Sequence, residues 1–158
     1  MSQLLSFKNI IWKCQPFSEL STLELYKILQ LRNEVFVVEQ DCPYQDCDGK
    51  DLEAYHLSAW NEDYVLAYTR LLPIGISYPD AASIGRVLTS PIARKQELGK
   101  ILMQKSIEKI QELFGDIPVK IGAQTYLKKF YESFSFFQIG EGYLEDGIPH
   151  ISMELKRN

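Results

Sequence analysis

Histidine and cysteine are scarce in this chain, which has two histidines and three cysteines among its 158 residues. The cysteines, Cys14, Cys42 and Cys47, are odd in number and not densely spaced, so a disulfide framework is not expected. Cys42 and Cys47 have no second pair of cysteines with which to complete a zinc site. We therefore expect reduced thiols in a cytoplasmic protein, and no bound metal.

Long apolar runs and a surplus of basic residues are also missing. No stretch approaches the roughly 20 apolar residues that a membrane span requires. No N-terminal stretch combines the basic, apolar and cleavage regions of a signal peptide. The formal net charge of −4 disfavours nucleic acids and anionic membranes as partners. We expect neither.

What is present is the composition of a globular protein. Hydrophobic residues make up 46% of the chain and charged residues 24%, which is a typical balance. A chain of this length fits one domain and can bury roughly 70% of its unfolded surface. No repeat or linker is apparent, so we expect a single domain over residues 1–158.

Acidic residues are concentrated between Glu39 and Glu53, where six carboxylates face one lysine. The simplest interpretation is a solvated loop. The alternative is a surface for a cationic partner such as an amine, because an acidic loop on a near-neutral body attracts positive charge.

Apolar periodicity and turn residues predict strands and helices in the order β-α-β-β-β-α-β-α-β-β. The late alternation of strands and helices favours a layered α/β fold. The expected strands cover residues 9–17, 55–60, 64–72, 83–90, 118–123, 136–143 and 150–155, and the expected helices residues 23–40, 98–114 and 125–134.

The first expected helix has Ser21 or Thr22 as a candidate N-cap, with Glu24 near its positive end. Arg32 falls on or beside its apolar face. Its stem would cover apolar surface while its head reaches water, or it would pair with a carboxylate near a site.

Residues 94–107, "RKQELGKILMQKSI", follow a strand and open a helix. A strand, a basic turn and a helix N-terminus together bind phosphate through backbone N–H groups and the helix dipole. Taken alone, the stretch is equally compatible with a plain surface helix.

Residues 87–103, "VLTSPIARKQELGKILM", resemble the acyl-CoA-binding core of the GCN5-related N-acetyltransferases (GNAT superfamily). That family shows an apolar strand, a proline and then Arg/Gln-x-x-Gly-x-Gly/Ala. Arg94 matches the leading cation and Gly99 the last small residue. Glu97 replaces the middle glycine, and Lys95 stands where a glycine is common. We expect the Glu97 carboxylate to face solvent and only its backbone to take part.

Other blocks are similar to the same family. Residues 122–136 resemble its Asn-x-x-Ala-x-x-x-Tyr-x-x-x-Gly-Phe segment, with Gln124 at the Asn position, Tyr131 at the Tyr position and Ser135 replacing the glycine. Residues 29–49 and 143–153 resemble its ElaA-type bacterial branch. The resemblance implies a central mixed, mostly antiparallel, splayed sheet flanked by helices.

The resemblance implies an enzyme that transfers acetyl from acetyl-CoA to an amine by direct attack, without a metal. Pantetheine would lie beside the strand at residues 84–89, with the Val87 N–H as oxyanion donor, and the pyrophosphate would lie on the N–H groups of residues 96–100. The expected cofactor-binding residues are Val87, Leu88, Thr89, Arg94, Lys95, Gln96, Glu97, Leu98, Gly99, Lys100 and Gln124.

Tyr131 is the expected acid for the departing thiolate, because the ordinary pKa of tyrosine, about 10, lies near that of a thiol. Spacing alone would make it a core tyrosine. The base is left open between His56, His150, Glu39 and an ordered water chain.

Arg32, Asp46 and Arg70 are the expected substrate-binding residues. A set of buried ion pairs formed by Arg32, Glu39 and Arg70 is a further interpretation. The acceptor would be a small-molecule or peptide amine, and exposed strand edges leave a homodimer open.

Two other functions remain open at this point. Acyl-homoserine-lactone synthases also have an "LR…VF" helix, an acidic loop and an "RLLP" strand end, as found here at residues 70–73. Those enzymes are longer, and this chain keeps the stretch from Arg94 to Gly99. The other possibility is a catalytically silent module that binds CoA or a metabolite.

Overall fold

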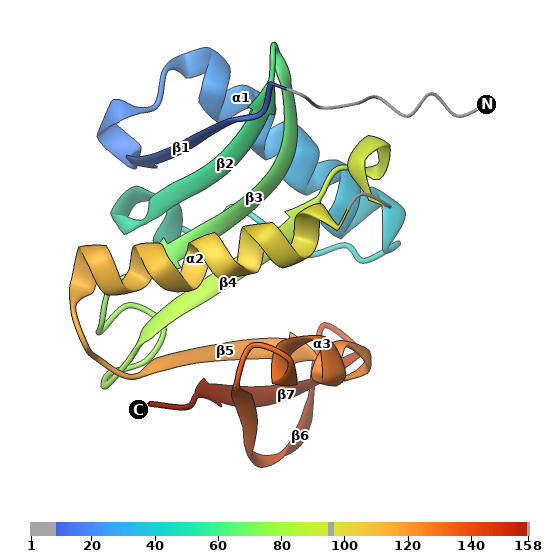
Figure 1. The fold of residues 1–158 in the computed structure, drawn as a ribbon. Coiled ribbons are helices and arrows are strands. Elements are labelled where there is room, and N and C mark those ends of the chain that lie inside the picture. Colours follow the sequence, from blue (N-terminus) through green and yellow to red (C-terminus); the bar gives the residue numbers. More distant parts are fainter. Residues whose placement is uncertain (1–8, 95–96, 158) are drawn as a thin grey trace.

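The computed structural model describes residues 9–94 and 97–157 (Figure 1). Within them, seven strands form one sheet in the order β1-β2-β3-β4-β5-β7-β6, and β4–β5 is the one parallel pair. The strands are β1 (Ile11–Pro16), β2 (Tyr55–Asn61), β3 (Tyr64–Leu72), β4 (Ala82–Thr89), β5 (Val119–Gln124), β6 (Phe136–Glu145) and β7 (Ile148–Leu155). The predicted mixed, mostly antiparallel sheet is confirmed.

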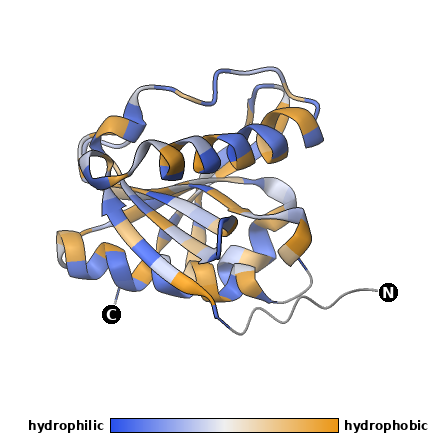
Figure 2. Cartoon of the chain, turned by 90° about the horizontal axis from the view of Figure 1, so that it is seen from above, coloured by the Kyte–Doolittle hydropathy of each residue, from blue (hydrophilic) through white to orange (hydrophobic). Residues whose placement is uncertain are grey.

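Helices lie on both faces of this sheet, as Figure 2 shows. The helices are α1 (Thr22–Arg32), the π-helix η2 (Asn33–Glu39), α2 (Leu98–Phe114) and α3 (Lys128–Glu132). Short 3-10 turns complete the chain: η1 (Phe17–Glu19), η3 (Lys50–Glu53), η4 (Pro91–Ala93) and η5 (Thr125–Leu127). Within the described residues, none of these helices has the length and apolar character needed to cross a membrane.

Two apolar clusters hold the layers together, because successive side chains of a strand point to opposite faces. On one face, Leu102 and Met103 of α2 pack against Leu57 and Ile84 of the sheet. On the other face, residues of α1 and η2 pack against a different set of strand side chains. That second cluster consists of Ile28, Leu31, Val35, Trp60, Val65, Tyr68 and Leu88.

The start of α1 follows its sequence signal. The Ser21 hydroxyl accepts a hydrogen bond from the Glu24 N–H at 3.0 Å, and the Glu24 carboxylate accepts one from the Ser21 N–H at 2.8 Å. This reciprocal capping box satisfies two free donors of the first turn. The helix expected over residues 23–40 does continue beyond Arg32, but as a π-helix rather than an α-helix.

A residue with positive φ stands at the end of α2 and another stands three residues after the end of α3. Gly115, with φ of +82°, ends α2 as expected. The helix predicted over residues 125–134 is α-helical only in α3, and the prediction was too long. Ser135, with φ of +73°, closes the following turn.

The strands β4 and β5 separate soon after they pair. Their register contains only Ala82 with Val119 and Ser83 with Lys120, and Figure 1 shows the two strands diverging from there. The register between β3 and β4 jumps from Tyr68–Leu88 to Arg70–Gly85. Two residues of β4 therefore oppose one of β3, which is a β-bulge and bends the strand.

Candidate functional site

A cavity of about 140 Å³ lies where β4 and β5 diverge. Residues 84–87 of β4 and 121–124 of β5 form two of its walls. Its remaining lining comes from η2 and the acidic loop, from α3 and the turn before it, and from the end of the β6–β7 hairpin: Phe36, Gln40, Cys42, Tyr44, Leu127, Tyr131, Glu145, Asp146, Ile148 and His150. The cavity thus occupies the gap in which the resemblance places pantetheine.

Side chains reach this cavity from both faces of the sheet. Tyr131 belongs to the apolar cluster under α2, together with Ala123 and Ile151. Gln124 follows Ala123 on β5, and His150 precedes Ile151 on β7. Gln124 and His150 are direct cross-strand partners. Because side chains alternate along a strand, Gln124 and His150 point to the face opposite Tyr131. The separation of β4 and β5 lets both sets line one space.

Tyr131 is buried, and its ring meets the rings of Phe130 and Phe136 edge-on. Burial raises the pKa of Tyr131 to about 12, because the phenolate would lose its hydration. The hydroxyl is therefore protonated at neutral pH and is available as a donor.

His150 presents one nitrogen for acid–base chemistry. Its Nδ1 lies 2.7 Å from the carbonyl oxygen of Ile148. Because a carbonyl oxygen only accepts, Nδ1 of the neutral ring carries the proton and Nε2 is the basic nitrogen. This Nε2 lies 3.5 Å from Oε2 of Glu145.

His56, the other histidine, is fully buried elsewhere. Its Nδ1 lies 2.6 Å from the Tyr68 hydroxyl and its Nε2 lies 2.9 Å from the Asp51 carbonyl oxygen. Burial lowers the pKa of His56, so the ring is neutral. The structure uses both nitrogens inside the protein and does not bring this histidine to the cavity.

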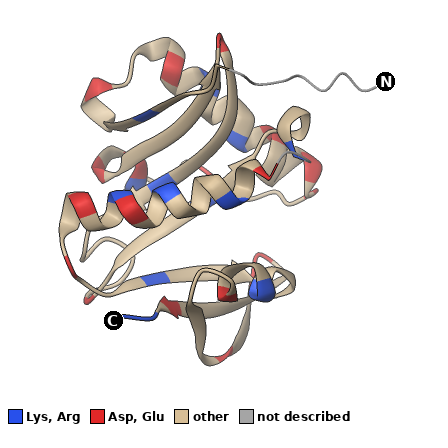
Figure 3. Cartoon of the chain, in the orientation of Figure 1, with Lys and Arg blue, Asp and Glu red and all other residues tan. Residues whose placement is uncertain are grey.

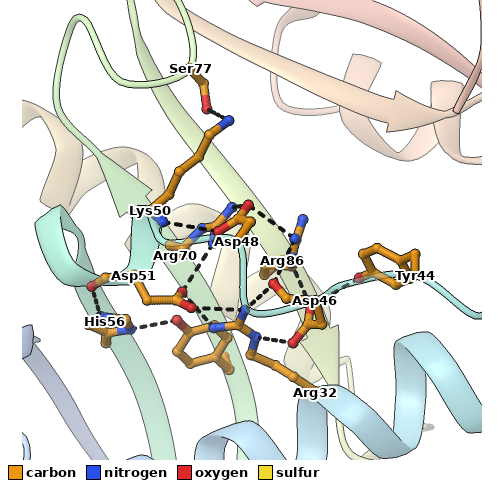
Figure 4. A network of polar contacts seen from close by, with 11 residues as sticks. Arg32, Tyr44, Asp46, Asp48, Lys50, Asp51, His56, Arg70, Ser77 and Arg86 are labelled. Atoms are coloured by element: carbon orange, nitrogen blue, oxygen red, sulfur yellow. Dashed lines mark hydrogen bonds and ion pairs between the residues drawn. The ribbon is translucent and has the colours of Figure 1, made fainter. Parts of the chain in front are cut away.

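Three arginines and three aspartates form an arginine–aspartate network beside the cavity (Figure 4). Its members are Arg32, Arg70, Arg86, Asp46, Asp48 and Asp51. Fully buried Arg32 donates to Asp46 at 2.9 Å and to Asp51 at 2.7 Å. The network therefore ties α1 to the acidic loop.

The other two arginines come from β3 and β4. Arg70 donates to Asp48 at 2.8 Å and to Asp51 at 3.1 Å. Arg86 donates to Asp46 at 2.7 Å and to Asp48 at 3.3 Å. Each of the three carboxylates is thus paired with two guanidinium groups.

This pairing corrects the expectation of a solvated loop for Asp46 and Asp51, whereas Glu39, Asp41, Asp48 and Glu53 are exposed. Asp46 and Asp51 are buried, and arginines from three different elements compensate their charge. The expected substrate-binding residues Arg32, Asp46 and Arg70 therefore come together, but in the network and not among the cavity-lining residues.

Arg86 links the network to the cavity, and sequence reasoning missed it. It lines the cavity, and its φ of +51° marks the β4 bulge next to Val87. A charged residue inside an otherwise apolar strand was the signal that could have found it. Tyr44 makes a similar link, since it lines the cavity and donates to Asp46 at 3.0 Å.

Glu39 takes no part in this network, so the predicted ion-pair set of Arg32, Glu39 and Arg70 is wrong. Glu39 instead accepts two hydrogen bonds from Arg94, at 2.6 and 2.5 Å. The Arg94 guanidinium lowers the pKa of Glu39. An expected phosphate ligand and a candidate base are thus paired with each other.

The loop before α2 is described in part, since Lys95 and Gln96 lie outside the described residues. Glu97 has φ of +55°, the left-handed backbone that glycine adopts most easily. Its side chain is 76% exposed, 3.3 Å from the Lys100 ammonium, in agreement with the expected solvent-facing carboxylate. Figure 3 shows both signs of charge along α2.

Gly99 has room for a side chain within the protein. A Cβ at Gly99 would meet the Thr89 methyl group at 3.9 Å, which is ordinary contact. The packing of the chain itself therefore does not require glycine here. The side chains of Leu88 and Leu98 are buried in the apolar clusters. Only the backbone of these two residues is therefore available to a ligand.

Across residues 9–94 and 97–157, no group of three or more His, Cys, Asp or Glu side chains is arranged to hold a metal ion.

Comparison of the sequence and the structure with known proteins identifies the family of this chain. The family model described as "Acetyltransferase (GNAT) domain" matches residues 29–157. Protein ElaA of Escherichia coli (strain K12) is 46% identical over 146 residues, which are 91% of this chain and 95% of the relative. Its crystal structure has a TM-score of 0.86 at 44% identity, covering 93% of this chain and 99% of that one.

Two further solved structures are similar to this chain. A crystal structure of an acyl-CoA N-acyltransferase from Pseudomonas aeruginosa has a TM-score of 0.86 at 44% identity and covers 92% of this chain and 99% of that one. A CoA-dependent acyl-homoserine lactone synthase, BjaI, has a TM-score of 0.75 at 17% identity, with 94% and 84% covered. This second likeness is one of fold alone. The chain therefore belongs to the GNAT acetyltransferase family, within its ElaA-type branch, and is by that membership an acyl-CoA acyltransferase.

Proposed function

We propose that this protein is an N-acetyltransferase that moves the acetyl group of acetyl-CoA to a primary amine where β4 and β5 diverge. One observation carries the proposal. The cavity there is lined from one face by the hydroxyl-bearing Tyr131 and from the other face by His150. A thioester and an amine that enter from opposite faces would meet between a proton donor and a proton acceptor.

The residues around the gap fit an acyl-CoA donor. Beyond Ser83, β4 has no β5 partner in the described register, so its backbone is open to pantetheine as an added strand would be. The Val87 N–H, at the bulge, would donate to the thioester oxygen, a contact whose loss typically costs about 3–4 kcal/mol of barrier. The start of α2, with Gly99 uncrowded, would hold the pyrophosphate, with Arg94 and Lys100 nearby.

The transfer is a direct attack. The amine nitrogen bonds to the acetyl carbon, and the carbon–sulfur bond breaks. His150 Nε2 takes the proton that the nitrogen loses, and the Tyr131 hydroxyl gives a proton to the departing sulfur. The products are an N-acetyl amine and the CoA thiol. We prefer His150 to His56 and Glu39 as the base, because of the three it is the residue that lines the cavity.

The test is acetyl-CoA turnover across a panel of primary amines, with thiol release measured and the acetylated product identified by mass. Acetyl-CoA at 100 times its Kd should add about 2.7 kcal/mol of stability. That corresponds to roughly 5–10 °C in Tm for a chain of this size.

The alternatives give other results. A silent module would show the thermal shift without turnover against any amine. A lactone synthase would release a lactone from S-adenosylmethionine and an acyl donor. No shift with either acetyl-CoA or CoA would refute the proposed function at its first step.

A further inference from the structure

A row of three side chains crosses the sheet beside the cavity. Gln124 of β5 lies opposite His150 of β7, which lies opposite Tyr143 of β6. Side chains of directly opposed residues share one face of a sheet, and this is the face away from Tyr131. The rings of His150 and Tyr143 are stacked, with centroids 5.8 Å apart and planes at 24°.

Gly122 leaves room for the Tyr143 side chain to extend over β5. It precedes Gln124 by two residues on β5 and so shares its face. A Cβ at Gly122 would stand 2.9 Å from the Tyr143 hydroxyl oxygen and 3.9 Å from that of Tyr78. Two tyrosine hydroxyls therefore converge over a residue without a side chain. Tyr78, Gly122, Tyr143 and His150 form what we call the aromatic shelf.

The outer part of the shelf faces solvent, whereas His150 at its inner end is buried. Tyr143 is 38% exposed. On this face α1 and η2 pack against the cluster around Tyr68 and Leu88, and Gln40 at the end of η2 accepts a hydrogen bond from Gln124 at 3.3 Å. Gly122 and His150 line the cavity directly. The shelf thus extends the cavity outward along β5 and β7, on the side from which an acceptor would approach.

The charge at the cavity end of the shelf is negative, whereas at the other end the Lys120 ammonium lies 5.9 Å from the centroid of the Tyr78 ring and pairs with Asp80 at 3.0 Å. Glu145 and Asp146 line the cavity beside His150, and the Glu145 carboxylate is 3.5 Å from the His150 Nε2. Arg86, the basic residue in the described lining, is already paired with two aspartates. An ammonium group would be attracted to this end of the cavity, and a carboxylate would be repelled.

We propose that the aromatic shelf is the acceptor subsite and that it takes a primary amine bearing a flat apolar group, such as an arylalkylamine. The flat group lies on Tyr143 beside the Tyr78 hydroxyl, and the amine reaches the His150 Nε2 beside Glu145. This inference deepens the proposed function and rests on it for the direction of approach. It adds the class of acceptor and the residues that select it.

Binding and turnover both test the shelf, with 2-phenylethylamine as the flat probe and n-butylamine as the amine without a ring. Affinity is measured by calorimetry on CoA-saturated protein, which needs no turnover. Aromatic contacts of this kind correspond to roughly 2- to 10-fold in affinity. Tyr143→Ala should weaken 2-phenylethylamine binding by that factor. It should also lower the amine ratio, which is kcat/KM for 2-phenylethylamine divided by kcat/KM for n-butylamine, by as much.

A rescue variant separates a role in binding from a role in folding. Gly122→Ala places a methyl group against the Tyr143 hydroxyl and should lower the same ratio. Adding Tyr143→Phe to it removes the hydroxyl, relieves the contact and should restore much of the ratio. Tyr64→Ala is the matched control, because Tyr64 is an exposed tyrosine at the far end of β3.

The results distinguish the two proposals. The shelf proposal would be overturned if Tyr143→Ala folds, binds CoA and turns over both amines with an unchanged amine ratio. The proposed transferase function would then still stand. Acetyl-CoA binding without turnover of any amine would refute the proposed function. In that case the binding measurement still tests the shelf proposal. Equal affinities of wild type and Tyr143→Ala for 2-phenylethylamine would overturn it as well.

Discussion

Replacing Arg32 by methionine removes the centre of the arginine–aspartate network. Arg32 is fully buried and donates to Asp46 at 2.9 and 3.1 Å and to Asp51 at 2.7 and 3.3 Å. Burial alone would lower the pKa of Arg32, but the hydrogen bond to Asp51 and the nearby carboxylates raise it, so the side chain stays charged. Removing one partner of a buried ion pair typically costs about 3–5 kcal/mol.

The lower end of that range applies here, because Asp46 keeps Arg86 and Asp51 keeps Arg70. We expect Arg32→Met to lower the free energy of unfolding by about 3 kcal/mol. For a chain of this length the Tm should fall by roughly 6–12 °C. Urea unfolding followed by circular dichroism measures the loss.

Arg157→Met is the matched control, because the ion pair of Arg157 with Asp116 is exposed and such pairs contribute about 1 kcal/mol or less. A loss below about 1 kcal/mol for Arg32→Met would show that the network does not hold the acidic loop as described.

Three further predictions follow from single contacts. Gly99→Ala should leave the unliganded protein at least as stable, since its Cβ would meet only Thr89 at 3.9 Å, yet calorimetry should show weaker acetyl-CoA binding; equal binding would mean that no ligand approaches Gly99. Glu39→Gln should release Arg94 and tighten acetyl-CoA binding with kcat nearly kept, whereas a hundredfold fall in kcat would make Glu39 the base. Burial alone would raise the pKa of Asp48, but its arginine partners lower it from 3.8 to about 2; its contribution to stability is therefore complete above about pH 4 and lost as the pH falls towards 2, and Asp48→Asn should flatten the stability curve there in acid titrations.

Most of the fold was predictable because its signals are local. The β2–β3 hairpin was predicted closely, since runs of β-branched and aromatic residues are bounded there by turn residues. The capping box at Ser21 and Glu24 lies within four residues of sequence. The change from α- to π-helix at Asn33 has no comparable local signal and was missed.

The site was less predictable because its contacts join distant residues. Glu39 and Arg94 are 55 residues apart, and Arg86 and Asp46 are 40 apart. The formal charge of the acidic loop predicted that it is solvated. The arginines that compensate Asp46 and Asp51 are distant in sequence and reach the loop only in the folded chain. The approach of Tyr143 to Gly122 likewise depends on the order of β5, β7 and β6 in the sheet.

The central claim is that acetyl transfer occurs where β4 and β5 diverge, with Tyr131 as the acid. The most direct measurement compares kcat for acetyl transfer and the Kd for acetyl-CoA in wild type and Tyr131→Phe, which keeps the buried ring and removes the hydroxyl. A positioned general acid contributes about 100- to 10,000-fold. We predict a fall in kcat of at least about 100-fold with the Kd nearly unchanged. An unaltered kcat in the folded variant would contradict the claim.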